Sequence, residues 1–285
     1  YCTRMLADCG ADVIKVEPRG GEHMRRKEPL RDGHSSYFGH LNTGKRSVEL
    51  DFDDRAALAR LKQLALDCDV VVENFRPGVA KRIGIDAASL MPEKPGLVYC
   101  SISGFGQEGP RAEQPAYAPI IHAASGLDMA TLACQQQQER PLNTGVYYAD
   151  LVAGVYAFGA IQTALLGQIR HGHGQVIDLA LMDCMINLMV IEVQEAQFPS
   201  AHARWVFQPV RAADGFVVVT PVSARNFREL CSTLEREDWL TDPRFATPAA
   251  RERNWNQLMQ EIEGWTSRHP AADCEALLMA AGVPC

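Results

Sequence analysis

Short apolar runs alternate with helical segments through the first two-thirds of the chain, and this alternation constrains the fold more than any other feature. The runs are rich in valine and isoleucine, and several end at proline, glycine or asparagine, as buried strands do. Runs of this kind occupy residues 11–18, 46–52, 69–75, 97–103 and 175–180. Because strands that alternate with helices form parallel sheets covered on both faces, the pattern predicts an α/β fold.

The segments beside these strands have the periodicity of helices. Residues 1–9 stop at Gly10, a favourable C-cap, and lead directly into the first expected strand. A helix that feeds a strand is half of a βαβ unit, so we expect a further strand upstream of Tyr1. A second helix is predicted over residues 54–68. Residues 18–40 are rich in Gly, Arg and Glu and are predicted to form a loop.

The longest uncharged run lies between Asp150 and Arg170 and has 19 residues. This length reaches the threshold for a transmembrane helix. The run contains glutamines, a threonine and glycines, however, so we interpret it as a helix buried in a soluble core. A further helical run is predicted over residues 182–197.

The pattern changes beyond Pro199. Asp214 and Gly215 form a turn signal before an apolar run, which predicts a hairpin. The remaining helical segments are residues 224–234, 249–266 and 271–281. We therefore predict a large α/β domain over residues 1–200 and a smaller domain over residues 201–285.

Composition narrows the class of protein. The formal net charge of −7 argues against a nucleic-acid or anionic membrane partner, since both require a basic surface. The nine cysteines form no C-x-x-C pair, and the histidines form no metal-binding motif, so no metal site is expected. Unpaired cysteines are typical of a reducing compartment, which predicts a cytoplasmic protein.

Asp150 is the first candidate for chemistry, because it stands at the start of the long apolar helix. One interpretation is an ordinary N-cap that accepts backbone N–H bonds. The other is a nucleophile whose pKa the helix N-terminus lowers, so that the ionised carboxylate attacks a thioester. Gly145 could supply a backbone donor for the oxyanion that forms.

Other candidates lie where strands end, the usual place for ligands in parallel sheets. Asn74 could hydrogen-bond a polar linker, and Phe75 could cover a planar or aliphatic group; a turn with a core aromatic is the alternative. Basic clusters could hold phosphates, although such clusters more often form a solvated face. They are Arg25-Arg26-Lys27, Lys45-Arg46 and Lys81-Arg82.

Several segments together resemble the class III CoA transferases, also called the CaiB/BaiF family, which includes formyl-CoA transferases. Their order and spacing agree over residues 1–200, and the small domain matches more loosely. The segments are residues 1–17, 44–51, 72–78, 101–106, 149–157 and 172–178.

The resemblance implies a transferase that moves CoA from an acyl-CoA to a carboxylic acid, with CoA as substrate and no tightly bound cofactor. It also implies a Rossmann-like large domain with a smaller α+β domain, an interlocked homodimer, and a chain truncated at both ends. Asp150 matches the nucleophilic aspartate, and Tyr117 matches an aromatic residue of the substrate region. The positions that match CoA contacts are Leu50, Asn74, Phe75, Arg82, Ile83 and Leu181.

Two positions depart from the resemblance. Asp53 stands where some relatives have a CoA-binding lysine, and Ala118 stands where an acidic residue often follows the aromatic. Two other functions stay open. An acyl-CoA racemase would need a histidine near Tyr117, for which His122 is the nearby substitute, and a non-catalytic CoA-binding subunit would need no nucleophile.

Overall fold

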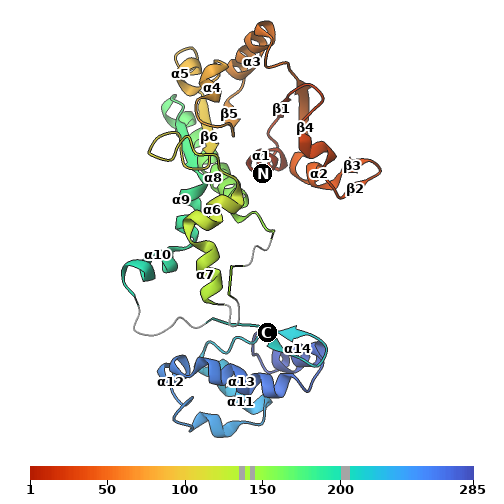
Figure 1. Cartoon of the computed structure of the whole chain (residues 1–285), viewed down its shortest axis with the longest axis vertical. Coiled ribbons are helices and arrows are strands. Elements are labelled where there is room, and N and C mark those ends of the chain that lie inside the picture. The colour runs from red at the N-terminus through yellow and green to blue at the C-terminus, as the bar shows by residue number, and fades with distance from the viewer. Residues whose placement is uncertain (135–138, 142–144, 200–205) are drawn as a thin grey trace. The chain divides into compact units, whose positions relative to one another are not determined.

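The computed structural model describes residues 1–134, 139–141, 145–199 and 206–285, and the chain divides into two units, Tyr1–Gln194 and Glu195–Cys285 (Figure 1). The domain boundary was predicted at residue 200. The four-glutamine run at residues 135–138 lies outside the described residues.

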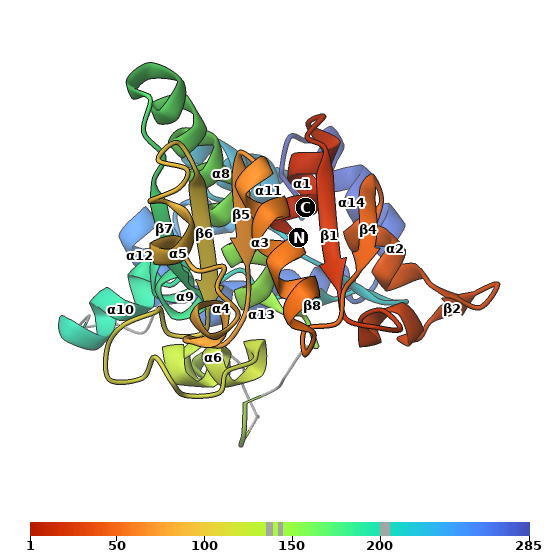
Figure 2. The same ribbon diagram turned by 90° about the horizontal axis from the view of Figure 1, so that it is seen from above.

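Five strands of the first unit form two parallel sheets (Figure 2). In one, β1 (Val13–Glu17) pairs with β4 (Lys45–Glu49). In the other, β6 (Val98–Ser103) lies between β5 (Val70–Glu73) and β7 (Val176–Ala180). The predicted α/β fold with parallel pairing is therefore confirmed. The ladders do not join into one sheet within the described part of the chain, because β1 and β5 share no hydrogen-bonded register.

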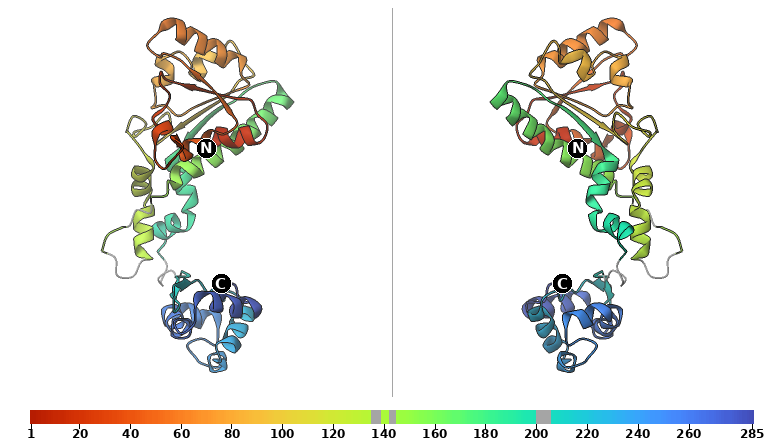
Figure 3. Two further views of the ribbon diagram at one scale, coloured as in Figure 1. Left: turned by 90° about the vertical axis from the view of Figure 1, so that its right-hand side faces the viewer. Right: turned by 90° about the vertical axis from the view of Figure 1, so that its left-hand side faces the viewer.

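Alternate side chains of β6 enter two different cores, as the two-residue period of a strand requires. Val98 and Cys100 pack with α1 (Cys2–Asp8) and α8 (Tyr148–His171) on one face. Tyr99 packs on the other face, against a core that includes α3 (Arg55–Asp67). Both faces of the central strand are thus covered, and Figure 3 shows α8 running along one of them.

Helix α8 is the one described helix that is long and apolar enough to cross a membrane, with a mean hydropathy of 1.5. In this unit it packs against α1, β6, β7 and α9 (Leu181–Leu188). Gly154 allows the close crossing with α1, since a Cβ there would lie 3.0 Å from the Cβ of Tyr1. One face of α8 is thus covered within this unit, and 33% of its most apolar window is buried.

Two predicted segments are wrong in part. Residues 18–40 hold a 3₁₀ turn, a short hairpin and α2 (Ser36–Asn42), which begins where the Ser35 hydroxyl accepts the Phe38 N–H at 3.2 Å. The single helix predicted over residues 182–197 is two helices that divide at Met189, whose ψ of 38° is not helical. The shorter elements of this unit are η1 (His23–Arg26), β2 (Leu30–Arg31), β3 (His34–Ser35), α4 (Val79–Arg82), α5 (Ala87–Leu90), α6 (Ala118–Ser125), α7 (Leu127–Ala133) and α10 (Val190–Gln197).

The second unit has a hydrophobic core of its own, in which Trp239, Phe245 and Leu258 are fully buried. Its hairpin pairs β8 (Val210–Arg211) with β9 (Phe216–Val217), as predicted. The helix predicted over residues 249–266 is interrupted at Asn254. The helical elements are α11 (Ala224–Thr233), η2 (Glu237–Leu240), α12 (Pro248–Arg253), α13 (Trp255–Thr266) and α14 (Ala271–Ala280).

Candidate active site

Asp150 lies in the first turn of α8, at the carboxyl edge of the β5–β6–β7 sheet. The direction of α8 follows from its far end, where the Gln168 side chain donates to the carbonyl of Gly96, just before β6 begins, at 2.7 Å. The helix therefore runs antiparallel to β6. Asp150 is the third residue of α8, and its N-cap position is Tyr147, so the interpretation of Asp150 as an N-cap is wrong.

The first turn of α8 is held by a buried histidine. Nε2 of His122 accepts the backbone N–H of Ala149 at 3.2 Å, and the His122 side chain is only 4% exposed. Its ring lies 5.7 Å from that of Tyr148. An Nε2 that accepts a hydrogen bond carries no proton itself. The imidazole thus positions the backbone next to Asp150.

The pKa of Asp150 is raised above its ordinary value, mainly because neighbouring atoms desolvate the carboxylate. Positive charges on His122 and on the amino terminus of Tyr1 act in the opposite direction, but desolvation outweighs both. The expectation that the pKa of Asp150 would be lowered is therefore wrong. The residue itself remains exposed, so the carboxylate is accessible to a substrate.

Three of the residues predicted to contact CoA share one hydrophobic cluster. Leu50, Phe75 and Ile83 pack together with buried side chains of α3 and β6. Arg82 ends α4 and is exposed, and it forms no ion pair within the described part of the chain. The Asn74 side chain donates to the carbonyl of Ile102 on β6 at 2.6 Å. This hydrogen bond ties the end of β5 to the end of β6. We call the five predicted residues Leu50, Asn74, Phe75, Arg82 and Ile83 the CoA group.

The other predicted residues lie with Asp150. Leu181 begins α9, is 7% exposed, and packs in one cluster with Ala149. Tyr117 is the N-cap residue of α6 and is 73% exposed, whereas the next residue, Ala118, is buried in that same cluster. Ile102 packs against this cluster, and its carbonyl accepts from Asn74. The end of β6 therefore connects the surroundings of Asp150 to the CoA group.

The basic clusters have different environments. Arg25 forms a bidentate pair with the buried Glu17, at 2.7 Å for both bonds, so it is not free to bind a phosphate. Arg46 pairs with Asp12. Lys45 is partly buried, and burial followed by the charge of Lys15 lowers its pKa to about 8.

Sequence reasoning missed two tyrosines beside Asp150. Burial raises the pKa of Tyr37, and the negative charges of Asp150 and Tyr147 raise it further. Lys27 lies with its Nζ 5.1 Å from the ring centroid of Tyr37 and 5.5 Å from that of Tyr147. No sequence signal reveals this group, because Lys27 and Tyr37 come close to Tyr147 only through the fold.

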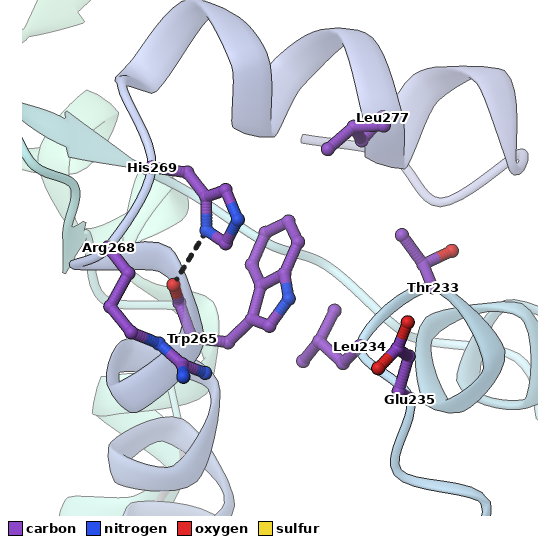
Figure 4. A pocket seen from close by; sticks show the side chains of 7 residues that line it. All are labelled: Thr233, Leu234, Glu235, Trp265, Arg268, His269 and Leu277. Carbon is purple, nitrogen blue, oxygen red and sulfur yellow. Dashed lines mark hydrogen bonds between the residues drawn. The ribbon is translucent and has the colours of Figure 1, made fainter.

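The second unit contains a separate cavity of about 460 Å³ (Figure 4). The indole of Trp265 stacks on the ring of His269 at 4.2 Å, and Nδ1 of His269 lies 3.0 Å from the Trp265 carbonyl. None of the residues predicted as site residues lines this cavity. Among the described residues, no cluster of His, Cys, Asp or Glu could hold a metal ion.

Comparisons with known proteins agree with one another. The sequence profile described as CoA-transferase family III matches residues 1–285. A succinate–glutarate CoA-transferase from Agrobacterium fabrum is 36% identical and aligns with 99% of this chain and 75% of its own length. An acetyl-CoA:oxalate CoA-transferase from Acetobacter aceti is 34% identical and aligns with 100% of this chain and 75% of its own length.

Two solved structures share the fold over nearly the whole chain. A CaiB/BaiF family protein from Brucella suis is 33% identical, with a TM-score of 0.83, over 100% of this chain and 78% of that one. Rv3272 from Mycobacterium tuberculosis is 28% identical, with a TM-score of 0.89, over 99% and 78%.

Proposed function

The chain belongs to CoA-transferase family III, and from that premise we propose that it transfers CoA between an acyl-CoA and a carboxylic acid through covalent intermediates on Asp150. The observation that supports this role is the position of Asp150: an exposed carboxylate in the first turn of α8, with a raised pKa, next to Ala149, which packs in one cluster with Leu181.

The reaction balances without a net proton. An oxygen of Asp150 attacks the thioester carbonyl, and the C–S bond breaks. The CoA thiolate is released, and the acyl group is joined to Asp150 as a mixed anhydride. The thiolate then attacks the Asp150 carbonyl of this anhydride and releases the donor carboxylate, which leaves an aspartyl-CoA thioester. The acceptor carboxylate attacks that thioester and displaces the CoA thiolate, which leaves a second mixed anhydride. The thiolate then attacks the acceptor's carbonyl carbon in this anhydride, which forms the new acyl-CoA and frees the Asp150 carboxylate.

The CoA group gives each part of CoA a partner of suitable chemistry. Leu50, Phe75 and Ile83 offer an apolar surface for the pantetheine arm and adenine. Arg82 offers an exposed guanidinium for phosphate, which suits the bidentate preference of arginine. Leu181 borders the thioester end beside Ala149. CoA acts as a substrate in this account, not as a resident cofactor.

Small carboxylic acids are the proposed second substrates. The names of relatives include succinate, glutarate and oxalate, which are dicarboxylic acids. Tyr117 is exposed at the start of α6 and offers an aromatic contact in the substrate region.

We also propose that the protein acts as an interlocked homodimer in the cytoplasm. Large apolar side chains stay exposed on α8 and α10, among them Ile169, Val190 and Ile191. An apolar surface of this kind is typical of a subunit interface. None of the cysteines forms a disulfide, as in proteins of reducing compartments.

An acyl-CoA exchange assay tests the proposal. The protein is incubated with succinyl-CoA and a panel of carboxylic acids, and mass spectrometry detects new acyl-CoA species. We expect new species with the native protein and a loss of on the order of 10³-fold or more with Asp150→Ala. Exchange that survives in Asp150→Ala would exclude covalent catalysis by this residue.

The same assay addresses the racemase alternative. His122 lies close to Asp150, but it is buried and its Nε2 accepts from Ala149, so it does not present a free base to a substrate. We therefore expect no solvent deuterium at the acyl α-carbon when the acceptor acid is omitted. Deuterium uptake without an acceptor would favour the racemase.

A further inference from the structure

The segment before Lys27 is fixed by a buried ion pair. Glu17 is 1% exposed and accepts two bonds from Arg25 and one from the Ser47 hydroxyl, all at 2.7 Å. These partners, Arg25 first, lower the pKa of Glu17 to about 2, so its negative charge persists at neutral pH. The Arg25 guanidinium also lies 4.3 Å from the ring centroid of Phe38 on α2.

Lys27 extends from this fixed turn to the aromatic rings beside Asp150. Its Nζ lies 5.1 Å from the ring centroid of Tyr37 and 5.5 Å from that of Tyr147. Tyr37 belongs to α2, the same helix as Phe38, and Tyr147 precedes the first turn of α8. Two rings from different elements therefore confine one ammonium group, as cation–π contacts do.

No carboxylate among the described residues neutralises the positive charge of Lys27. Lys15 pairs with Glu22 at 3.0 Å and Arg25 pairs with Glu17, whereas Lys27 forms no ion pair with any described residue, Asp150 included. The side chain is exposed. Tyr147 lies three residues before Asp150, and the charge of Asp150 acts on Tyr37, so an exposed ammonium between these two rings can attract an anionic substrate toward Asp150.

We propose that Lys27, held between Tyr37 and Tyr147, binds the distal carboxylate of a dicarboxylic acid while its other carboxylate reacts at Asp150. This inference rests on the proposed function and adds a specificity-determining residue to it. A monocarboxylic acid has no group for Lys27, so the lysine separates the two classes of acceptor.

The test compares acceptors of equal length with a donor that lacks a distal carboxylate. Acetyl-CoA is the donor, and glutarate and pentanoate are the acceptors, for the native protein, Lys27→Gln and Lys27→Arg. We expect kcat/KM for glutarate to fall on the order of 10- to 100-fold in Lys27→Gln, since a hydrogen bond between charged groups is lost. We expect the value for pentanoate to change by less than about 3-fold, and Lys27→Arg to restore most of the glutarate rate.

Lys62→Gln is the matched control, because Lys62 pairs with Glu93 on the surface and its loss changes the net charge equally. An equal loss with both acceptors in Lys27→Gln, or a selective rise in the KM for acetyl-CoA, would overturn the inference and assign Lys27 to CoA binding or to folding. A native protein that uses pentanoate but not glutarate would also overturn it. Failure of the native protein with every acid, in contrast, would reject the proposed function itself.

Discussion

Asp150 combines a helix N-terminal position with a desolvated carboxylate, and these two features act on its pKa in opposite directions. The N-terminal dipole favours the anion, while partial desolvation of the carboxylate favours the acid, and the pKa of Asp150 is raised on balance. A carboxylate with a raised pKa is a stronger nucleophile at a given degree of ionisation. The ionised form of this carboxylate therefore lowers the stability of the folded protein.

This balance predicts that the charge of Asp150 destabilises the fold at neutral pH. A group whose pKa is raised by folding contributes stability at low pH and loses it as the pH rises through its folded pKa. Asp150→Asn should therefore keep or raise the melting temperature while it abolishes transfer. The transfer rate of the native protein should fall in acid as Asp150 is protonated, and the midpoint should lie above the ordinary value of 3.8.

Asp183 supplies the control, because it is the third residue of α9 as Asp150 is of α8. Asp183→Asn should lose the usual helix-dipole contribution of about 0.5 kcal/mol. Thermal unfolding of both variants at neutral pH measures the contrast. If Asp150→Asn were the less stable of the two, the assignment of a desolvated carboxylate would be wrong.

The residues around Asp150 also show where sequence reasoning stops. Asp150 was identified from its place before an apolar helix, and the CoA-contacting positions from resemblance to a family. His122 was noted only as a substitute for a racemase base, whereas in the structure it accepts the Ala149 N–H. The group of Lys27, Tyr37 and Tyr147 depends on contacts between the N-terminal region and the start of α8, which no local pattern encodes.

At the scale of elements, the backbone just before β7 lies very close to the backbone just before β6. The N–H of Gly174 donates to the carbonyl of Pro95 at 2.8 Å, and a Cβ on Gly174 would lie 1.8 Å from the carbonyl oxygen of Leu97. Any side chain there must displace the backbone that leads into β6. This contact determines how β6 and β7 start in register.

We therefore expect Gly174→Ala to lower the free energy of unfolding by about 2–3 kcal/mol, as overpacking does. Gly159→Ala is the matched control, because Gly159 lies in α8 with open space at its Cβ position. That change should stabilise the protein by about 0.5–1 kcal/mol through helix propensity. Urea denaturation measures both, and equal effects of the two substitutions would contradict the steric account.

The elements that sequence patterns predicted are those with strong local signals. The apolar runs became β1, β4, β5, β6 and β7, and their parallel pairing followed. Helix α2 was missed because its surroundings are rich in Gly, Arg and Glu and its start depends on the cap at Ser35. The breaks at Met189 and Asn254 lie inside continuous helical periodicity, so local pattern could not locate them.

At the scale of the whole molecule, the two units contain different chromophores. All seven tyrosines lie before residue 195, and all four tryptophans lie after it. Tryptophan fluorescence therefore reports on the second unit, and tyrosine signals report on the first. Every residue assigned to the reaction or to CoA lies in the first unit.

Acyl-CoA should thus raise the unfolding midpoint seen by tyrosine more than the midpoint seen by tryptophan. A ligand at 100 times its dissociation constant stabilises the unit that binds it by about 2.7 kcal/mol. Thermal unfolding with both signals, with and without acyl-CoA, makes the comparison. Equal shifts would mean that the units unfold together or that both bind CoA.

The most direct test of covalent catalysis by Asp150 is to trap the intermediate. The protein is mixed with acyl-CoA, quenched with hydroxylamine or borohydride, digested, and examined by mass spectrometry. The account predicts a hydroxamate or a reduced aspartate at Asp150 alone, formed only when acyl-CoA is present and absent in Asp150→Asn. A protein that exchanges acyl groups but yields no modified Asp150, or yields the adduct at another carboxylate, would contradict it.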